Sequence, residues 1–114
     1  MTNTTDDKEF AHYITDLMQS MGPVSAKPMF GGYGIFLNSL MFGLIADGEL
    51  YLKVDAQTQA DFTDKGLAAF SYNKKGKLVN MSYFQAPEET LEDTEEMQHW
   101  ANKAYAAALR AASH

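Results

Sequence analysis

Three closely spaced glycines are the first residues of this chain whose type and spacing could indicate a ligand-binding loop. Gly31, Gly32 and Gly34 lie within four residues of one another, a density that phosphate-binding loops also show. A P-loop ends in Gly-Lys-Ser/Thr before a helix, and a dinucleotide fingerprint also needs a helix after its glycines. Here the pattern predicts another strand. We therefore expect a bulge or sharp bend, with at least one of these glycines at a positive φ.

The side chains that catalysis or metal binding would need are scattered. His12, His99 and His114 have no partner at ligand spacing, and we expect His12 and His99 at the surface beside apolar stripes. A serine triad needs a nucleophile beside a histidine and an acid. That setting is missing around four serines, which are Ser25, Ser39, Ser71 and Ser82. The sequence predicts no catalytic residue, no metal site and no cofactor.

Carboxylates concentrate around the start of the last predicted helix. They are Glu88, Glu89, Glu92, Asp93, Glu95 and Glu96. Negative charge at a helix N-terminus is stabilised by the helix dipole and needs no ligand. A glycosidase-like pair would place two carboxylates across a cleft, which a local run does not supply. We interpret the cluster as structural.

Lys74, Lys75 and Lys77 form the one basic concentration in the sequence. Lysine is common on exposed turns, so a solvated hairpin tip is the simpler interpretation. The alternative is an electrostatic contact with an acidic partner, or with nucleic acid held mainly by something else. Three lysines alone give only weak, salt-sensitive attachment to nucleic acid. These residues are our candidates for a partner contact.

Hydrophobic spacing predicts the elements that carry these residues. A first helix begins at Thr5 or Asp6 and ends at Gly22-Pro23. Its apolar face comprises Phe10, Tyr13, Ile14, Leu17, Met18 and Met21. Four strands follow, at about 27–30, 33–38, 40–46 and 49–54. Asp47-Gly48 is a strong hairpin signal between the last two.

In the second half of the sequence, the pattern predicts a short helix over 56–65, a hairpin of strands at 70–73 and 78–85, and a helical turn at Pro87. Asp93 caps a last helix. The buried stripe of that helix comprises Met97, Trp100, Ala101, Ala104, Ala108 and Ala111. The order helix, four strands, helix, two strands, helix indicates an α+β fold, a two-layer sandwich with a largely antiparallel sheet.

Length and composition set the frame for this fold. The 114 residues predict one domain over 1–114 with an ordered core of about 6–112, and 46% hydrophobic residues are typical of a globular protein. A net charge of -6 argues against direct binding of duplex DNA. The chain has no cysteine, no signal-like start and no membrane-spanning run, so we expect a cytoplasmic protein.

The sheet itself carries the most informative pattern. The strand Leu40-Met-Phe-Gly-Leu-Ile-Ala46 is apolar on both faces, and Tyr51 alternates with buried-type residues in the next strand. Three helices cover one face of a six-stranded sheet but not two. We expect Phe36, Tyr51 and one parity of the third strand on a second face, which predicts a homodimer. In the competing arrangement, the last helix and the segment after Pro87 cover that face.

Two segments of this chain resemble the TfoX N-terminal domain family. The first is Lys27-Pro-Met-Phe-Gly-Gly-Tyr-Gly-Ile-Phe36, followed by Leu40-Met-Phe-Gly-Leu-Ile-Ala-Asp-Gly-Glu-Leu-Tyr-Leu-Lys-Val-Asp55. The second comprises Phe70-Ser-Tyr-Asn-Lys-Lys-Gly-Lys, Met81-Ser-Tyr-Phe and Pro87-Glu-Glu. The similarity runs from about residue 8 to 112. Five residues match the family signature as structural positions: Met29, Phe30, Gly31, Gly32 and Gly34.

The resemblance implies a secretion-chaperone-like architecture and a role in regulating bacterial competence genes. Members of this family are regarded as co-activators that act with the cyclic-AMP receptor protein at promoters, which makes that protein or RNA polymerase the implied partner. It brings no catalytic residues and no established binding residues. Full-length members carry a second, C-terminal domain.

Our leading hypothesis is therefore a non-enzymatic, cytoplasmic interaction domain that takes part in transcriptional regulation through protein contacts. The alternative is a small-ligand-binding or chaperone-like module without a competence role.

Overall fold

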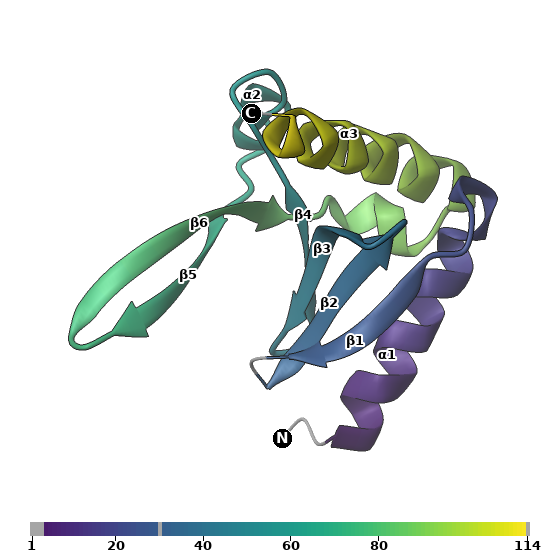
Figure 1. Cartoon of the computed structure of the whole chain (residues 1–114), viewed down its shortest axis with the longest axis horizontal. Coiled ribbons are helices and arrows are strands. Elements are labelled where there is room, and N and C mark those ends of the chain that lie inside the picture. The colour runs from purple at the N-terminus through teal and green to yellow at the C-terminus, as the bar shows by residue number, and fades with distance from the viewer. Residues whose placement is uncertain (1–3, 30, 114) are drawn as a thin grey trace.

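Among the described residues, six strands form one antiparallel sheet in the order β1-β2-β3-β4-β6-β5. The computed structural model describes residues 4–29 and 31–113 (Figure 1). The strands are β1 (Ser25–Met29), β2 (Gly32–Leu37), β3 (Leu40–Ala46), β4 (Glu49–Lys53), β5 (Ala69–Lys74) and β6 (Lys77–Gln85). The predicted order of elements and the α+β class are confirmed. The expected first strand began two residues too late, and its last residue, Phe30, lies outside the described residues.

Two-residue turns close three of the hairpins. Both central residues of each turn have a positive φ, as a type I′ turn requires. These residues are Asn38 and Ser39, Asp47 and Gly48, and Lys75 and Gly76. The Asp47-Gly48 hairpin predicted from the sequence is confirmed, and the strands that each of these turns joins lie side by side in the sheet.

In the part of the chain that the structure describes, three α-helices and two 3₁₀ turns accompany the sheet. They are α1 (Thr4–Leu17), η1 (Gln19–Met21), α2 (Gln59–Thr63), η2 (Glu88–Leu91) and α3 (Thr94–Ala112). Asp93 caps α3 as predicted, because its side chain accepts a hydrogen bond from the Glu95 backbone N–H at 2.9 Å. The second helix is shorter than predicted. Asp55 accepts from the Thr58 backbone N–H, and the Thr58 hydroxyl accepts from the Asp55 N–H, so a turn precedes α2.

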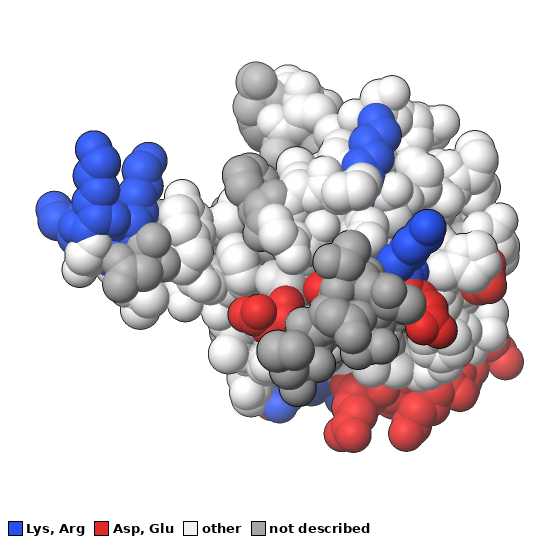
Figure 2. Space-filling model, turned by 90° about the horizontal axis from the view of Figure 1, so that it is seen from below, with Lys and Arg blue, Asp and Glu red and all other residues white. Residues whose placement is uncertain are grey.

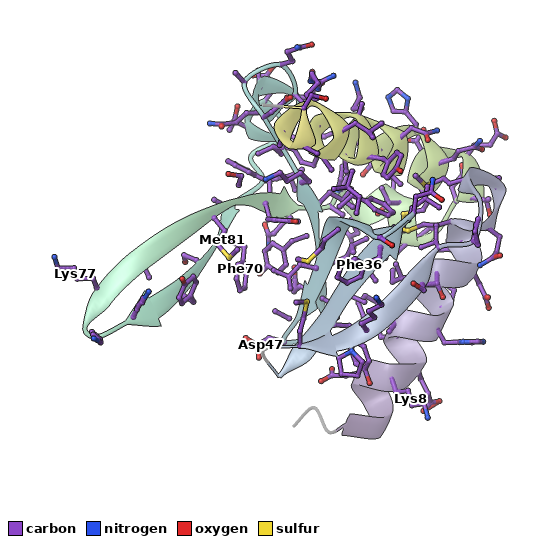
Figure 3. The ribbon with its side chains drawn as sticks, in the orientation of Figure 1. Lys8, Phe36, Asp47, Phe70, Lys77 and Met81 are labelled. Carbon is purple, nitrogen blue, oxygen red and sulfur yellow. The ribbon has the colours of Figure 1, made fainter. Side chains whose placement is uncertain are left out.

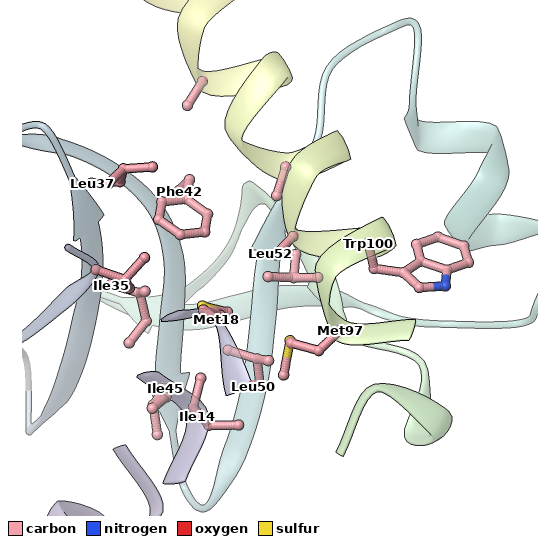
Figure 4. Close-up of a cluster of buried hydrophobic side chains, with 14 of the residues drawn as sticks. Ile14, Met18, Ile35, Leu37, Phe42, Ile45, Leu50, Leu52, Met97 and Trp100 are labelled. Carbon is pink, nitrogen blue, oxygen red and sulfur yellow. The ribbon is translucent and has the colours of Figure 1, made fainter. Parts of the chain in front are cut away.

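The helices α1 and α3 pack on the same face of the sheet and form the core with it. Ile14 of α1, Met18 directly after α1, and Met97 of α3 are fully buried in one cluster with side chains from β2, β3 and β4 (Figure 4). Leu91, after Pro87, also packs against this cluster. The competing arrangement, in which α3 and the segment after Pro87 cover the second face, is therefore wrong.

Two residues of the predicted helical faces lie elsewhere. Tyr13 is 46% exposed, and its hydroxyl donates a hydrogen bond to the Leu91 carbonyl at the edge of the core. Ala111 is exposed, whereas Ala107 is buried. The last turn of α3 is held at the surface, where Arg110 forms an ion pair with Asp55.

The hairpin of β5 and β6 projects away from the rest of the molecule (Figure 1). Its base belongs to the sheet, since Tyr51, Leu52 and Lys53 of β4 pair with β6. Its free end has no helix beside it in the view of Figure 1. Over residues 4–29 and 31–113, none of the helices is both long and apolar enough for a membrane span.

Candidate functional site

The sheet face opposite the helices is apolar and has no helix over it. We call it the uncovered face, and its described side chains include Met29, Phe36, Met41, Leu44, Ala46, Tyr51, Phe70, Tyr72 and Met81. Phe36 and Tyr51 each lie between residues that belong to the core, so strand alternation directs them to this face. Phe36 and Tyr51 therefore lie on the side of the sheet away from the helices, and their role in a dimer stays a prediction.

A β-bulge decides which residues of β3 reach the uncovered face. Ile35 pairs with Gly43 and Phe36 pairs with Met41, so Phe42 is an extra residue in β3. The expectation that one parity of this strand faces outward is wrong. Phe42 lies in the core, whereas Met41 and Leu44 lie on the uncovered face. The bulge thus changes which apolar side chains of this seven-residue strand lie on each face.

A groove of about 460 Å³ lies where the projecting hairpin leaves the sheet. Met41, Leu44 and Ala46 line it from β3, and Phe70, Tyr72 and Met81 line it from the hairpin. Figure 3 shows Phe70 and Met81 in the angle between the hairpin and the sheet. Tyr51 contacts Phe70 edge to face with ring centroids 4.9 Å apart, and this contact braces the base of the hairpin.

Sequence reasoning identified Phe36 and Tyr51 but missed the hairpin's share of this surface. Phe70 and Tyr72 alternate with Ser71, which is the signal for a strand with one apolar face. The position of Met81 was harder to predict, because the register between β5 and β6 shifts between Ala69 and Ser71. The sequence alone does not show that these side chains face Met41 across a groove.

Lysines and tyrosines border the apolar residues. The Lys27 ammonium lies 4.9 Å from the Phe36 ring centroid, and that of Lys53 lies 5.3 Å from the Tyr83 ring centroid. Burial raises the pKa of Tyr83 to about 12. Burial also raises the pKa of Tyr51, with a further contribution from nearby carboxylates. Both phenols are therefore neutral at pH 7.

The candidate partner-contact lysines lie at the free end of the hairpin. Lys74 and Lys77 are directly opposite each other, and Lys75 is in the turn between them. All three are exposed. Figure 2 shows this basic cluster standing away from a body on which the acidic side chains gather. Like charges that face each other across two strands are destabilising, so local hairpin stability does not account for this trio.

The signature glycines serve backbone geometry. Gly31 has a φ of +76°, which confirms the predicted left-handed residue. Gly32 is needed for a different reason, since a Cβ there would lie 1.9 Å from the Ile45 carbonyl oxygen. At Gly34 a Cβ would meet the sulfur of Met29 at 2.4 Å. The geometry at these glycines is consistent with the structural role that we predict for the signature residues, and Phe30 lies outside the described residues.

The remaining candidates lie far from the groove or at the surface. His12 is exposed beside Asp16 on α1, and His99 is exposed on α3, as predicted. His114 lies outside the described residues. Over residues 4–29 and 31–113, no three side chains of the metal-binding types come together. The carboxylates that precede α3 include Glu89, which forms an ion pair with Lys65 at 2.8 Å.

Comparison with known proteins places this geometry in a family. The TfoX N-terminal domain family matches residues 16–108. "DNA transformation protein TfoX1" of Aliivibrio fischeri is 32% identical over 73 residues, which cover 64% of this chain and 35% of that protein. "Protein Sxy" of Escherichia coli is 25% identical over 73 residues, with the same coverage. The matched part thus spans about a third of each relative's length. Because the family match extends over most of the chain, the protein belongs to the TfoX N-terminal domain family.

Proposed function

We propose that this domain takes part in transcriptional regulation of competence genes through protein contacts, as a non-enzymatic module. The observation that carries the proposal is the uncovered face, because a contiguous apolar surface on a soluble domain marks an interaction site. The relative in Aliivibrio fischeri is named as a DNA transformation protein, which supports a competence role. The groove is lined mainly by apolar and aromatic side chains, which supports a binding function.

The proposed partners are proteins of the transcription machinery. The family resemblance implies the cyclic-AMP receptor protein or RNA polymerase, with the domain as a cytoplasmic co-activator. The chain has 15 acidic and nine basic residues, and three of the basic ones are confined to the hairpin tip. Phosphate contacts need more positive charge than this, so protein contacts are favoured over direct binding of duplex DNA.

A second candidate function has support in the size of the groove. Its volume of about 460 Å³ falls within the range of about 300–1,000 Å³ that small-ligand sites occupy. Met41 and Met81 supply the flexible, polarisable lining that suits a site for varied apolar ligands or chain segments. The alternative is therefore a small-ligand-binding or chaperone-like module without a competence role.

A binding assay with purified components tests the leading proposal. The chain is immobilised, and cyclic-AMP receptor protein with cyclic AMP, or RNA polymerase, is passed over it. We expect one of them to be retained, and Phe36→Asp/Tyr72→Asp to weaken retention by about tenfold or more. The matched control is Leu109→Asp, which adds a charge to an exposed apolar residue of α3.

Three outcomes contradict the proposal. The first is that neither protein is retained. The second is that the control weakens retention as much as the face variant does. The third is tight binding of duplex DNA at physiological salt with a steep salt dependence, which would make DNA the direct partner.

A further inference from the structure

Two groups of oppositely charged side chains lie at the two ends of the groove. The basic tip comprises Lys74, Lys75 and Lys77 at the free end of the hairpin. The acidic turn comprises Asp47 and Glu49, both exposed, and begins next to the groove residue Ala46. Figure 3 shows Lys77 and Asp47 at separate extremities of the molecule, with Phe70 and Met81 between them. Within one copy, the tip therefore does not reach the turn.

The basic tip concentrates three lysines that form no ion pair among the described residues, whereas the other lysines without an ion pair there, Lys8, Lys27 and Lys53, stand singly in the sequence. Lys65, Lys103 and Arg110 each form an ion pair with a carboxylate. Across residues 4–29 and 31–113, Lys74, Lys75 and Lys77 form none. Concentrated positive charge without a counter-ion attracts an acidic surface from outside the copy.

The hairpin also lacks packing at its free end. A two-stranded ribbon is marginally stable in water unless a further surface supports it. One side of this ribbon carries Phe70 and Tyr72, whose rings stack with centroids 6.5 Å apart, and Tyr72 is 40% exposed. A partner that covers these rings removes apolar area from water and supports the ribbon.

We propose that a second copy of this chain occupies the groove, and that the basic tip of each copy contacts the acidic turn of the other. In a twofold dimer every contact occurs twice, so one interface neutralises both tips and both turns. Phe70, Tyr72 and Met41 of the two copies supply the apolar centre. A second copy is favoured over an unrelated protein because this chain itself carries the complementary charge beside the same groove.

The proposal rests on the proposed function only in treating the uncovered face as a protein-contact surface. It names the occupant of that surface. The acidic turn lies close enough to this face to act on it, since burial raises the pKa of Tyr51 and the charges of Glu49 and Asp47 raise it further. Charge complementarity then fixes the orientation of the two copies, while the apolar centre supplies the affinity.

A charge-exchange experiment tests this dimer. The tip variant is Lys74→Glu/Lys75→Asn/Lys77→Glu, and the turn variant is Asp47→Asn/Glu49→Lys. Asn is used at positions 75 and 47 because both have a positive φ, which Asn tolerates. Chromatography with light scattering measures the mass of each variant and of their equimolar mixture.

The wild-type chain is expected at twice its mass of 12.7 kDa. Each variant alone places like charges together and should dimerise about tenfold more weakly or worse. In the mixture, every tip faces a turn of opposite charge, so the dimer should return. Lys8→Glu and Glu92→Lys, exposed charge reversals away from the groove, should leave the dimer intact.

A wild-type monomer at tens of micromolar, or a mixture that stays monomeric although both variants keep the wild-type melting temperature, overturns the inference. If the monomer still retains RNA polymerase or the cyclic-AMP receptor protein, the proposed function stands without the dimer. If the exchange succeeds but neither transcription protein is retained, the dimer stands and the proposed function fails.

Discussion

Tyr51 of β4 meets Phe70 of β5 edge to face, with ring centroids 4.9 Å apart, although β6 separates their strands in the sheet order. The contact spans the uncovered face at the base of the hairpin. It therefore holds the hairpin at its angle to the sheet and maintains the shape of the groove.

A double-mutant cycle on these two rings measures that contact. Tyr51→Leu, Phe70→Leu and the double variant are compared by hydrogen exchange of the hairpin amides. Aromatic pairs contribute about 0.5–1.5 kcal/mol beyond the area they bury, so we expect a coupling free energy in that range. Additive effects of the two single changes would mean that the contact does not brace the hairpin.

The glycines of the signature should respond unequally to alanine. Gly32→Ala forces a Cβ against the Ile45 carbonyl oxygen, and we expect a loss of about 3 kcal/mol in unfolding free energy. Gly31→Ala meets no atom within 4 Å and should cost only about 1 kcal/mol, from its positive φ. Urea unfolding measures both. A larger loss at position 31 than at position 32 would contradict this explanation.

Strand positions and turn chemistry were predictable because they are local. Asp47-Gly48 indicates its hairpin without help from the rest of the chain. The face that each residue of β3 occupies was not predictable. The extra residue Phe42 interrupts alternation, and it is placed by packing against α3, where its ring contacts Tyr105 edge to face at 5.5 Å. The groove could not be predicted either, since it depends on the angle at which the hairpin leaves the sheet.

Ser39 is a site where the fold can be stabilised. It occupies the second central position of the β2–β3 turn at a φ of +66°, where a side chain costs roughly 1 kcal/mol. Ser39→Gly should therefore raise the melting temperature. The control, Ser71→Gly in β5, should lower it, because glycine weakens a strand interior. If Ser39→Gly also lowers the melting temperature, strain at the positive φ of Ser39 does not dominate the effect of this residue on stability.

Asp55 should make stability depend on acidic pH. A hydrogen bond from Arg110 is the main cause that lowers its pKa to about 2 from an ordinary value of 3.8. A carboxylate with a lowered pKa stabilises the fold above its unfolded pKa, and this contribution is lost as pH falls from about 4 toward 2.

Asp55→Asn isolates this effect, because an amide oxygen still accepts the hydrogen bond from the Thr58 N–H but carries no charge. Unfolding free energies of both proteins are measured from pH 5 to pH 2. The wild-type advantage should shrink across this interval. An advantage that stays constant would contradict the assigned pKa.

Thiol footprinting tests most directly whether the uncovered face is the surface that contacts proteins. The chain has no native cysteine, so single residues introduced by Tyr72→Cys or Leu109→Cys report separately on the uncovered face and on the exposed side of α3. Alkylation by a maleimide is timed with and without excess unlabelled chain, RNA polymerase or cyclic-AMP receptor protein. We predict that at least one of these proteins slows alkylation at position 72 by about tenfold and leaves position 109 unchanged. Protection at position 109 alone, or at neither position, would contradict the assignment of the uncovered face as the contact surface.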